Sequence, residues 1–381
     1  MENVFSPAKN LGFGLMRLPL NKQPKNDADI DMDELNRMVD TFLERGFTYF
    51  DTALMYCGGE SEAAIRRALV ERHDRGTFTL TDKLHSAYIN TAEDCDRVFN
   101  GQLEKTGVEY FDYYLIHDVN VESYPKYEAL KVFEWAQRKK AEGKIRHVGF
   151  SFHDTPELLE EVLTKHPEAE FVQLQLNYLD YDSPAINSRR CYETAVRHNK
   201  PVVVMEPVKG GTLVRLPEEA LAKFRACDPE ASAASWAIRF AASHEHVCMV
   251  LSGMSNMEQL LDNTSYMSDF RPLTDEEKAV IGEVVEELKN STAIPCTGCS
   301  YCTGGCPMQI PIPKYFALYN GQMREDPKGE KGWTPQTEYY ANATLVHAKA
   351  SECIGCGQCE GICPQHLNVI DYLKKVAEIF E

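Results

Sequence analysis

Short apolar runs recur between longer amphipathic segments from residue 11 to residue 253. The runs are rich in residues that favour strands, and the segments between them carry helix signals. We predict eight strands, at residues 11–16, 48–51, 78–83, 110–117, 145–151, 171–178, 201–207 and 248–253. Eight β–α units in about 285 residues favour a (β/α)8 barrel over a doubly wound sheet.

The ends of the intervening segments support this assignment. Residues 31–46 have acids in the first turn and end on Gly46, which suits a helix C-terminus. A second segment begins with Asp154 or Thr155 as its cap and has Pro156 at its start. No G-x-G-x-x-G follows a predicted strand, which also disfavours a dinucleotide-binding doubly wound sheet.

A change in composition near residue 290 divides the chain of 381 residues. A predicted helix at 274–290 is followed at once by a cysteine-rich tail. We therefore expect the barrel in residues 1–290 and a small second domain in residues 291–381. Within the tail, residues 320–342 are rich in glycine, proline and charge, and we predict an inserted loop or lid there.

Eight of the 13 cysteines fall in two copies of the pattern C-x2-C-x2-C-x3-C-P, at residues 296–307 and 353–364. This is the run of bacterial ferredoxins, in which the fourth cysteine of each run binds the other cluster. We predict two [4Fe-4S] clusters, in a ferredoxin-like domain. Their ligands are Cys296, Cys299, Cys302 and Cys363 for one cluster, and Cys353, Cys356, Cys359 and Cys306 for the other.

Structural zinc is the alternative for such cysteines. Tetrahedral zinc sites usually pair two C-x2-C units, whereas each run here has three cysteines at this spacing and then C-P. A disulfide framework fits less well, because the first residues lack the apolar region of a signal peptide. No run of about 18 apolar residues occurs either, so we expect a soluble, cytoplasmic protein and no membrane partner.

The chain carries 40 Lys and Arg against 58 Asp and Glu, a formal net charge of −18. This charge argues against nucleic acid or an anionic membrane as a partner. The acidity serves solubility in one interpretation, and in the other it forms a docking surface for a basic redox partner.

Four polar residues lie at or just past the C-terminal ends of predicted strands, where barrels of this type carry their chemistry. They are Asp51, Tyr56, Lys83 and His117. Reduction of a carbonyl places negative charge on its oxygen, so a proton donor must lie within reach of that oxygen. A tyrosine with an ammonium beside it can fill this role, and a carboxylate can keep the ammonium in place.

Residues 9 to about 285 resemble the aldo-keto reductase family, through LGFGLMRLP, YFDTALMY, TDK, YYLIHD, HVGFS, VQLQLNY and VLSGMSN. The tail resembles the ferredoxin-like extension of one branch of that family. The resemblance implies that Tyr56 is the proton donor and Lys83 the cation beside it. It further implies that Asp51 is the partner of Lys83 and that His117 orients the substrate oxygen.

The resemblance also implies a nicotinamide dinucleotide. Its expected contacts are Ser151 and Gln173 at the carboxamide, and Gly253, Ser255, Gln259 and Asn263 after the last strand. The pattern departs at Phe152 and Met205, where the family has an asparagine and an aromatic residue. Glu258 and Asp262 stand where NADPH-binding members have basic residues, and acids would repel a 2′-phosphate. These acids favour NADH over NADPH, and a barrel that binds no nicotinamide is the alternative.

Three functions compete at this stage. The first is an oxidoreductase that interconverts a small-molecule carbonyl and an alcohol by hydride transfer, with structural or electron-relay clusters. The second is an electron-transfer enzyme that couples a ferredoxin or flavoprotein to the barrel, although each cluster moves one electron and a nicotinamide moves two. The third is a cluster-bearing sensor or scaffold, against which the complete set of four polar residues argues.

Overall fold

The computed structural model describes residues 4–5, 7–290, 293–296, 298–328, 330 and 332–381. All the predicted strands are present, and each lies within a few residues of its predicted bounds. They are β1 Leu11–Gly14, β2 Tyr49–Asp51, β3 Thr79–His85, β4 Phe111–Val119, β5 Ile145–Phe152, β6 Phe171–Gln175, β7 Val202–Met205 and β8 Val247–Ser252.

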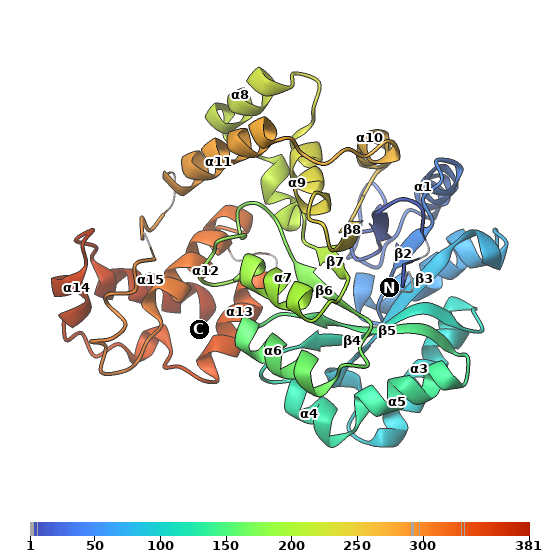
Figure 1. Cartoon of the computed structure of the whole chain (residues 1–381), viewed down its shortest axis with the longest axis horizontal. Helices are drawn as coiled ribbons and strands as arrows, with labels where there is room; N and C mark the ends of the chain where they lie inside the picture. The colour runs from blue at the N-terminus through green and yellow to red at the C-terminus, as the bar shows by residue number, and fades with distance from the viewer. Residues whose placement is uncertain (1–3, 6, 291–292, 297, 329, 331) are drawn as a thin grey trace. The chain divides into compact units, whose positions relative to one another are not determined.

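The strands form one closed, parallel barrel in chain order (Figure 1). Each strand pairs with the next, and β1 closes the ring by pairing with β8, where Phe13 lies opposite Ser252. Between β2 and β3, Asp51 lies opposite Thr81. The predicted (β/α)8 fold is therefore confirmed, and all the strands end at the same side of the barrel.

Helices connect the strands and continue through the cysteine-rich tail. They are α1 Met32–Glu44, α2 Ser61–Ile65, α3 Ala92–Thr106, α4 Tyr124–Ala129, α5 Val132–Ala141, α6 Pro156–Lys165, α7 Ser188–Arg197, α8 Glu218–Cys227, α9 Ala233–Ala242, α10 Met257–Ser268, α11 Asp275–Asn290, α12 Ile312–Glu325, α13 Pro335–Thr344, α14 Gln358–Ile362 and α15 Val369–Phe380. Asp31 caps α1 and Thr155 caps α6, each accepting a hydrogen bond from a backbone N–H of the first turn.

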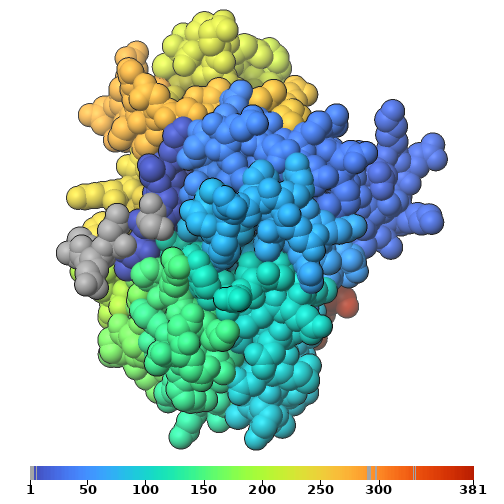
Figure 2. Space-filling view, turned by 90° about the vertical axis from the view of Figure 1, so that its right-hand side faces the viewer, coloured from blue at the N-terminus to red at the C-terminus, as the bar shows by residue number. Residues whose placement is uncertain are grey.

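Large side chains fill the barrel interior. Tyr49, Tyr113 and Phe171 belong to one buried cluster with Phe5 of the N-terminal segment, which stacks on Tyr113 at 4.8 Å between ring centroids. Gly149 makes room for this packing, because a Cβ there would lie 2.6 Å from the backbone oxygen of Phe171. In Figure 2 the segments of the first β–α units, coloured blue to green, form a continuous surface. Within the described residues, every helix is too short or too polar to cross a membrane.

The chain divides into two compact units whose boundaries do not follow the sequence in a simple way. The first unit contains Met1–Asn177, Arg190–Val208 and Ala234–Leu273. The second contains Tyr178–Arg189, Lys209–Ala233 and Thr274–Glu381. The second unit therefore includes the cysteine-rich tail together with the segments that directly follow β6 and β7.

The expectation of an inserted loop over residues 320–342 is not met. Residues 320–325 continue α12, and α13 begins at Pro335, so the connection is short. Pro335 occupies the first helical position behind the capping residue Thr334, where proline is favourable. Gly321 lies inside α12, where a Cβ would lie 3.0 Å from Gln336 Cγ of α13. The glycine therefore permits close helix packing, and the proline starts a helix.

Candidate active site and cluster sites

The four predicted catalytic residues come from three neighbouring strands and one turn. Asp51 is the last residue of β2, Lys83 lies in β3 and His117 lies in β4. Tyr56 opens a short turn in which the next three residues all have positive φ. The turn brings Tyr56 back over the strand ends, so the structure gathers all four side chains in one site.

A buried ion pair organises this site. Lys83 Nζ lies 2.5 Å from Asp51 Oδ1 and donates a second hydrogen bond, of 2.7 Å, to the backbone oxygen of Thr52. The same ammonium lies 4.7 Å from the ring centroid of Tyr56. Asp51 and Lys83 are 2% and 1% exposed, so this charge pair is shielded from solvent. The pair holds a positive charge against Tyr56.

Burial and charge act in opposite directions on Tyr56. Burial raises the pKa of Tyr56, the charge of Lys83 lowers it, and the net pKa lies above the ordinary tyrosine value. Burial lowers the pKa of Lys83, but the charge of Asp51 and the hydrogen bonding of Lys83 outweigh burial and raise the net value. At neutral pH Tyr56 is therefore protonated beside a charged Lys83, which is the state that a proton donor requires.

His117 completes the site opposite Tyr56. The two rings meet edge to face, with centroids 6.1 Å apart. Burial, followed by the charges of Lys83 and His85, holds the pKa of His117 well below its ordinary value, so the ring is neutral at neutral pH. Its Nδ1 is buried and has no hydrogen-bond partner within the described part of the chain. His85, which the sequence analysis missed, packs on His117 at 5.2 Å, and its place at the end of β3 is the signal that identifies it.

Ser151 and Gln173 are direct partners in the register of β5 and β6. The hydroxyl of Ser151 accepts a 2.7 Å hydrogen bond from the backbone N–H of Asp118. Gln173 Nε2 lies 3.5 Å from Met205 Sδ, and its buried Oε1 has no partner among the described residues. A ligand amide could donate to this oxygen, so the two residues fit a carboxamide.

Three of the four residues predicted after β8 lie at the N-terminal end of α10. Gly253 is exposed there, and the backbone N–H of Ser255 donates to Gln259 Oε1 at 2.8 Å. Asn263 lies deeper, where its Nδ2 donates to Ser252 Oγ at 2.9 Å and its Oδ1 accepts from a tyrosine hydroxyl at 2.6 Å. Its amide is thus engaged within the barrel wall.

Arg17, in the loop after β1, joins this group although the sequence analysis did not single it out. Its backbone oxygen accepts a 3.0 Å hydrogen bond from Ser255 Oγ, and its guanidinium lies 3.5 Å from a Glu206 carboxylate oxygen. A Cβ on Gly253 would lie 3.5 Å from Arg17 Cβ. A cation beside a helix N-terminus favours an anionic ligand. A basic residue in a loop after a barrel strand is the signal that could have identified it.

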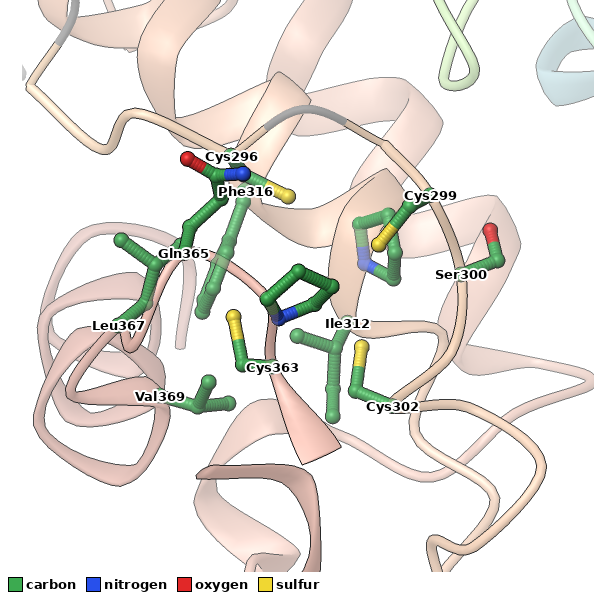
Figure 3. Close-up of a pocket in the computed structure, with 12 residues that line it drawn as sticks. Cys296, Cys299, Ser300, Cys302, Ile312, Phe316, Cys363, Gln365, Leu367 and Val369 are labelled. Carbon is green, nitrogen blue, oxygen red and sulfur yellow. The ribbon is translucent and has the colours of Figure 1, made fainter. Parts of the chain in front are cut away.

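The predicted cluster ligands divide between two cavities. Cys296, Cys299, Cys302 and Cys363 line the first. Figure 3 shows their four sulfur atoms turned towards a common space, with Phe316 of α12 beside them. The fourth cysteine of the second run thus faces the three leading cysteines of the first.

The second cavity repeats this arrangement with the runs exchanged. It is lined by Cys306 of the first run and by Cys353, Cys356 and Cys359 of the second. Ile312 of α12 lines both cavities. Both predicted sets of four cysteines are therefore brought together, each around its own cavity.

The cavities fit a polynuclear group. Within the described residues, no three His, Cys, Asp or Glu side chains converge closely enough to hold a single metal ion. Each set of sulfurs instead surrounds a space, as ligands at the corners of an iron–sulfur cube do. Burial raises the pKa of the Cys302 thiol to about 11.

Residues 10–286 match the Aldo/keto reductase family, and residues 295–368 match a 4Fe-4S dicluster domain. An aldo-keto reductase of Mycolicibacterium paratuberculosis is 27% identical over 190 residues, which span 49% of this chain and 62% of that protein. The match thus covers less than two thirds of that relative.

Two solved structures share the fold. The holo form of aldo-keto reductase AKR11C1 from Bacillus halodurans has a TM-score of 0.59 and 25% identity, over 72% of this chain and 91% of that one. An aldo-keto reductase from Klebsiella pneumoniae in complex with NADPH has a TM-score of 0.57 and 19% identity, over 72% of this chain and 90% of that one. At that identity the second likeness concerns the fold alone.

The barrel and its strand-end site define a (β/α)8 protein of the oxidoreductase class, joined to an iron–sulfur domain. The chain belongs to the Aldo/keto reductase family and carries a 4Fe-4S dicluster domain in its C-terminal part. The resemblance seen in the sequence motifs is thereby confirmed.

Proposed function

We propose that the protein is a nicotinamide-dependent reductase of a small-molecule carbonyl, with Tyr56 as proton donor. The observation that carries this proposal is the buried pair of Asp51 and Lys83, whose ammonium lies 4.7 Å from the ring centroid of Tyr56. A cation fixed against a phenol has a direct use in proton transfer, because it stabilises the phenolate left behind.

Each polar side chain of the site has one role in the proposed reduction. A nicotinamide dinucleotide, when bound, would supply the hydride for the carbonyl carbon. As negative charge develops on the carbonyl oxygen, the hydroxyl of Tyr56 donates its proton to it. Lys83 stabilises the resulting phenolate, and Asp51 holds Lys83 charged and in place. His117, neutral at neutral pH, offers an N–H that can orient the same oxygen.

The proposed nucleotide site runs from Gln173 and Ser151, at the carboxamide, to the N-terminal end of α10. There Gly253, Ser255 and Gln259 surround the position for an anionic group, and Asn263 supports them from the barrel wall. We propose NADH here, because Glu258 and Asp262 of α10 would disfavour the additional phosphate.

We propose residues 291–381 as the iron–sulfur domain, with two [4Fe-4S] clusters. Cys296, Cys299, Cys302 and Cys363 would hold one cluster, and Cys353, Cys356, Cys359 and Cys306 the other. The crossed lining of the two cavities supports this set of ligands. When bound, the clusters would supply one-electron chemistry or hold the domain together.

Electron transfer with a ferredoxin or flavoprotein is the second candidate. One observation favours it: Tyr301 and Ile354, which lie within the two cysteine runs, are each 63% exposed. Apolar side chains at the surface beside a redox centre suit the docking of another redox protein.

One experiment separates the two candidates. The protein is purified without oxygen, and its visible absorption is followed after addition of NADH or NADPH, with and without a panel of aldehydes and ketones. We expect carbonyl-dependent oxidation of the nucleotide, faster with NADH, while the cluster absorption stays unchanged. Bleaching of the clusters by nucleotide alone would instead support electron transfer, and no nucleotide oxidation with any carbonyl would count against the first proposal.

Replacement of Lys83 by methionine tests the cation beside Tyr56. Loss of the ammonium removes the charge that lowers the pKa of Tyr56, so the pKa rises further. Because the protonated phenol is the donor, the alkaline limb of kcat/KM should move to higher pH. The maximal rate should also fall by at least about 100-fold, since the phenolate loses its counter-charge. An unchanged alkaline limb in the pH profile would contradict this role for Lys83.

A further inference from the structure

The segments that follow β6 and β7 fold with the cluster ligands. Residues 178–189 begin two residues after Leu176, which follows β6, and residues 209–233 begin soon after Met205, the last residue of β7. Both segments belong to the compact unit that carries the cysteines. In a (β/α)8 barrel the loops at these strand ends build the substrate site. The same segments are therefore continuous in the chain with barrel strands and belong to the compact unit that carries the cysteines.

The loop after β6 contributes directly to the apolar core of the iron–sulfur unit. Ala185 and Ile186, each 3% exposed, belong to the same buried cluster as Cys302 and Phe316. Pro184 lies beside the first cysteine run, since a Cβ on Gly298 would lie 3.8 Å from Pro184 Cγ. Because protein cores are close-packed, this loop cannot keep its arrangement if the core around the cysteines loosens.

The loop after β7 is held by a buried polar network. Lys209, 2% exposed, lies 2.7 Å from both carboxylate oxygens of Asp180 in the loop after β6. With its amide oriented to suit its neighbours, Gln336 accepts from Lys209 Nζ at 3.2 Å and donates to Glu325 Oε2 at 3.1 Å. Through these hydrogen bonds the loops after β6 and β7 are connected to Glu325 of α12 and Gln336 of α13.

Helix α12 connects this network with the cluster cavities. Its first residue, Ile312, lines both cavities, and Phe316 lines the first. Its last residue, Glu325, packs so closely on Gly210 that a Cβ there would overlap the carboxylate. Gly210 also has a φ of +60°, which favours glycine. One rigid helix therefore reaches from the cysteines to the loop after β7.

We propose that the iron–sulfur unit holds the loops after β6 and β7 in their substrate-binding arrangement, so that loss of the clusters releases these loops and weakens substrate binding. The clusters then control the reductase through structure, with no electron passing through them. This inference rests on the proposed reductase function for its kinetic consequence. The physical link between clusters and loops stands independently of it.

The kinetic test compares two glycines of similar backbone conformation. Gly210→Ala forces a methyl group onto Glu325, whereas Gly143→Ala, at a φ of +75°, meets no atom within 4 Å. Both variants carry the backbone strain, and one disturbs the contact with α12. We expect Gly210→Ala to raise KM for the carbonyl about tenfold with kcat within about threefold, and Gly143→Ala to change neither parameter. Iron content and NADH affinity should remain those of the parent in both variants.

The structural test needs no activity. The full chain is digested with trypsin, with its clusters intact or after their destruction by oxygen. We expect cleavage after Lys209, which is 2% exposed, to become rapid when the clusters are lost. Cleavage after Lys165, whose side chain is 54% exposed in the barrel, serves as the control and should not change.

The outcomes are distinguishable. Unchanged protection of Lys209 after cluster loss would overturn the inference, as would equal rises in KM for both glycine variants. If the parent reduces no carbonyl, the proposed function fails, and the digestion still decides whether the clusters hold the loops.

Discussion

Replacement of Tyr56 by phenylalanine is expected to lower the rate of carbonyl reduction by about 10²–10⁴-fold, because the substitution removes the proton donor and little volume. Tyr56 sits in a short turn outside the strands, so the loss of one hydroxyl should leave the packing of the barrel unchanged. The measurement is steady-state kinetics with saturating nucleotide, together with iron analysis and a thermal unfolding curve.

Tyr124→Phe is the matched control for this variant. Tyr124 lies in α4, is 5% exposed, and its hydroxyl has no hydrogen-bond partner within the described part of the chain. The same atom is removed, and activity should stay at the parental level. If Tyr56→Phe keeps activity within about tenfold of the parent, a barrier change of only about 1.4 kcal/mol, the donor is another group.

Truncation of the chain after residue 340 is expected to abolish both clusters. The parent should contain about eight irons per chain and the truncated form close to none. The first run keeps its four cysteines in this variant, but Cys306 faces the second cavity and Cys363 is lost from the first. The apolar core is also divided, because Cys302 of the first run packs in the same buried cluster as Leu373 of α15.

Two point variants refine this test. Cys306→Ser should damage the cluster of the second run, although Cys306 belongs to the first. Cys227→Ser, at an exposed position on α8, should retain about eight irons and serves as the control. Four stable irons in the truncated chain would refute crossed ligation, and two tightly bound zinc ions in the parent would refute the cluster assignment.

The electrostatics of the proton donor could be predicted only in part. The pattern of strand ends identified Tyr56 with Lys83 and Asp51, and the expected lowering effect of Lys83 on the pKa of Tyr56 is present. The net shift is nevertheless upward, because burial outweighs the ammonium. The extent of desolvation depends on every atom packed around a side chain, so no local pattern in the sequence encodes it.

The helices of the tail show where local signals misled. Gly321 and Pro335 were interpreted as loop residues, yet the glycine sits between two packed helices and the proline starts one. Both residues disrupt a helix interior but suit a close contact or a first turn. Whether such a residue ends a helix or fits into one depends on the helices that pack beside it in the folded chain.

The sequence by itself determined the barrel, and its motifs predicted the four polar residues at the strand ends and the pairing of the two cysteine runs. The strands and the cysteine runs recur along the chain, and the four polar residues lie at or just past strand ends. Each of these features is therefore signalled by the residues next to it in the sequence. Only the tertiary structure decided that the loops after β6 and β7 fold with the cysteines, through the pair of Lys209 with Asp180 and the packing of Ile186. Such contacts join residues that are far apart in the chain, and the free energy of burying them leaves no periodic pattern in either partner.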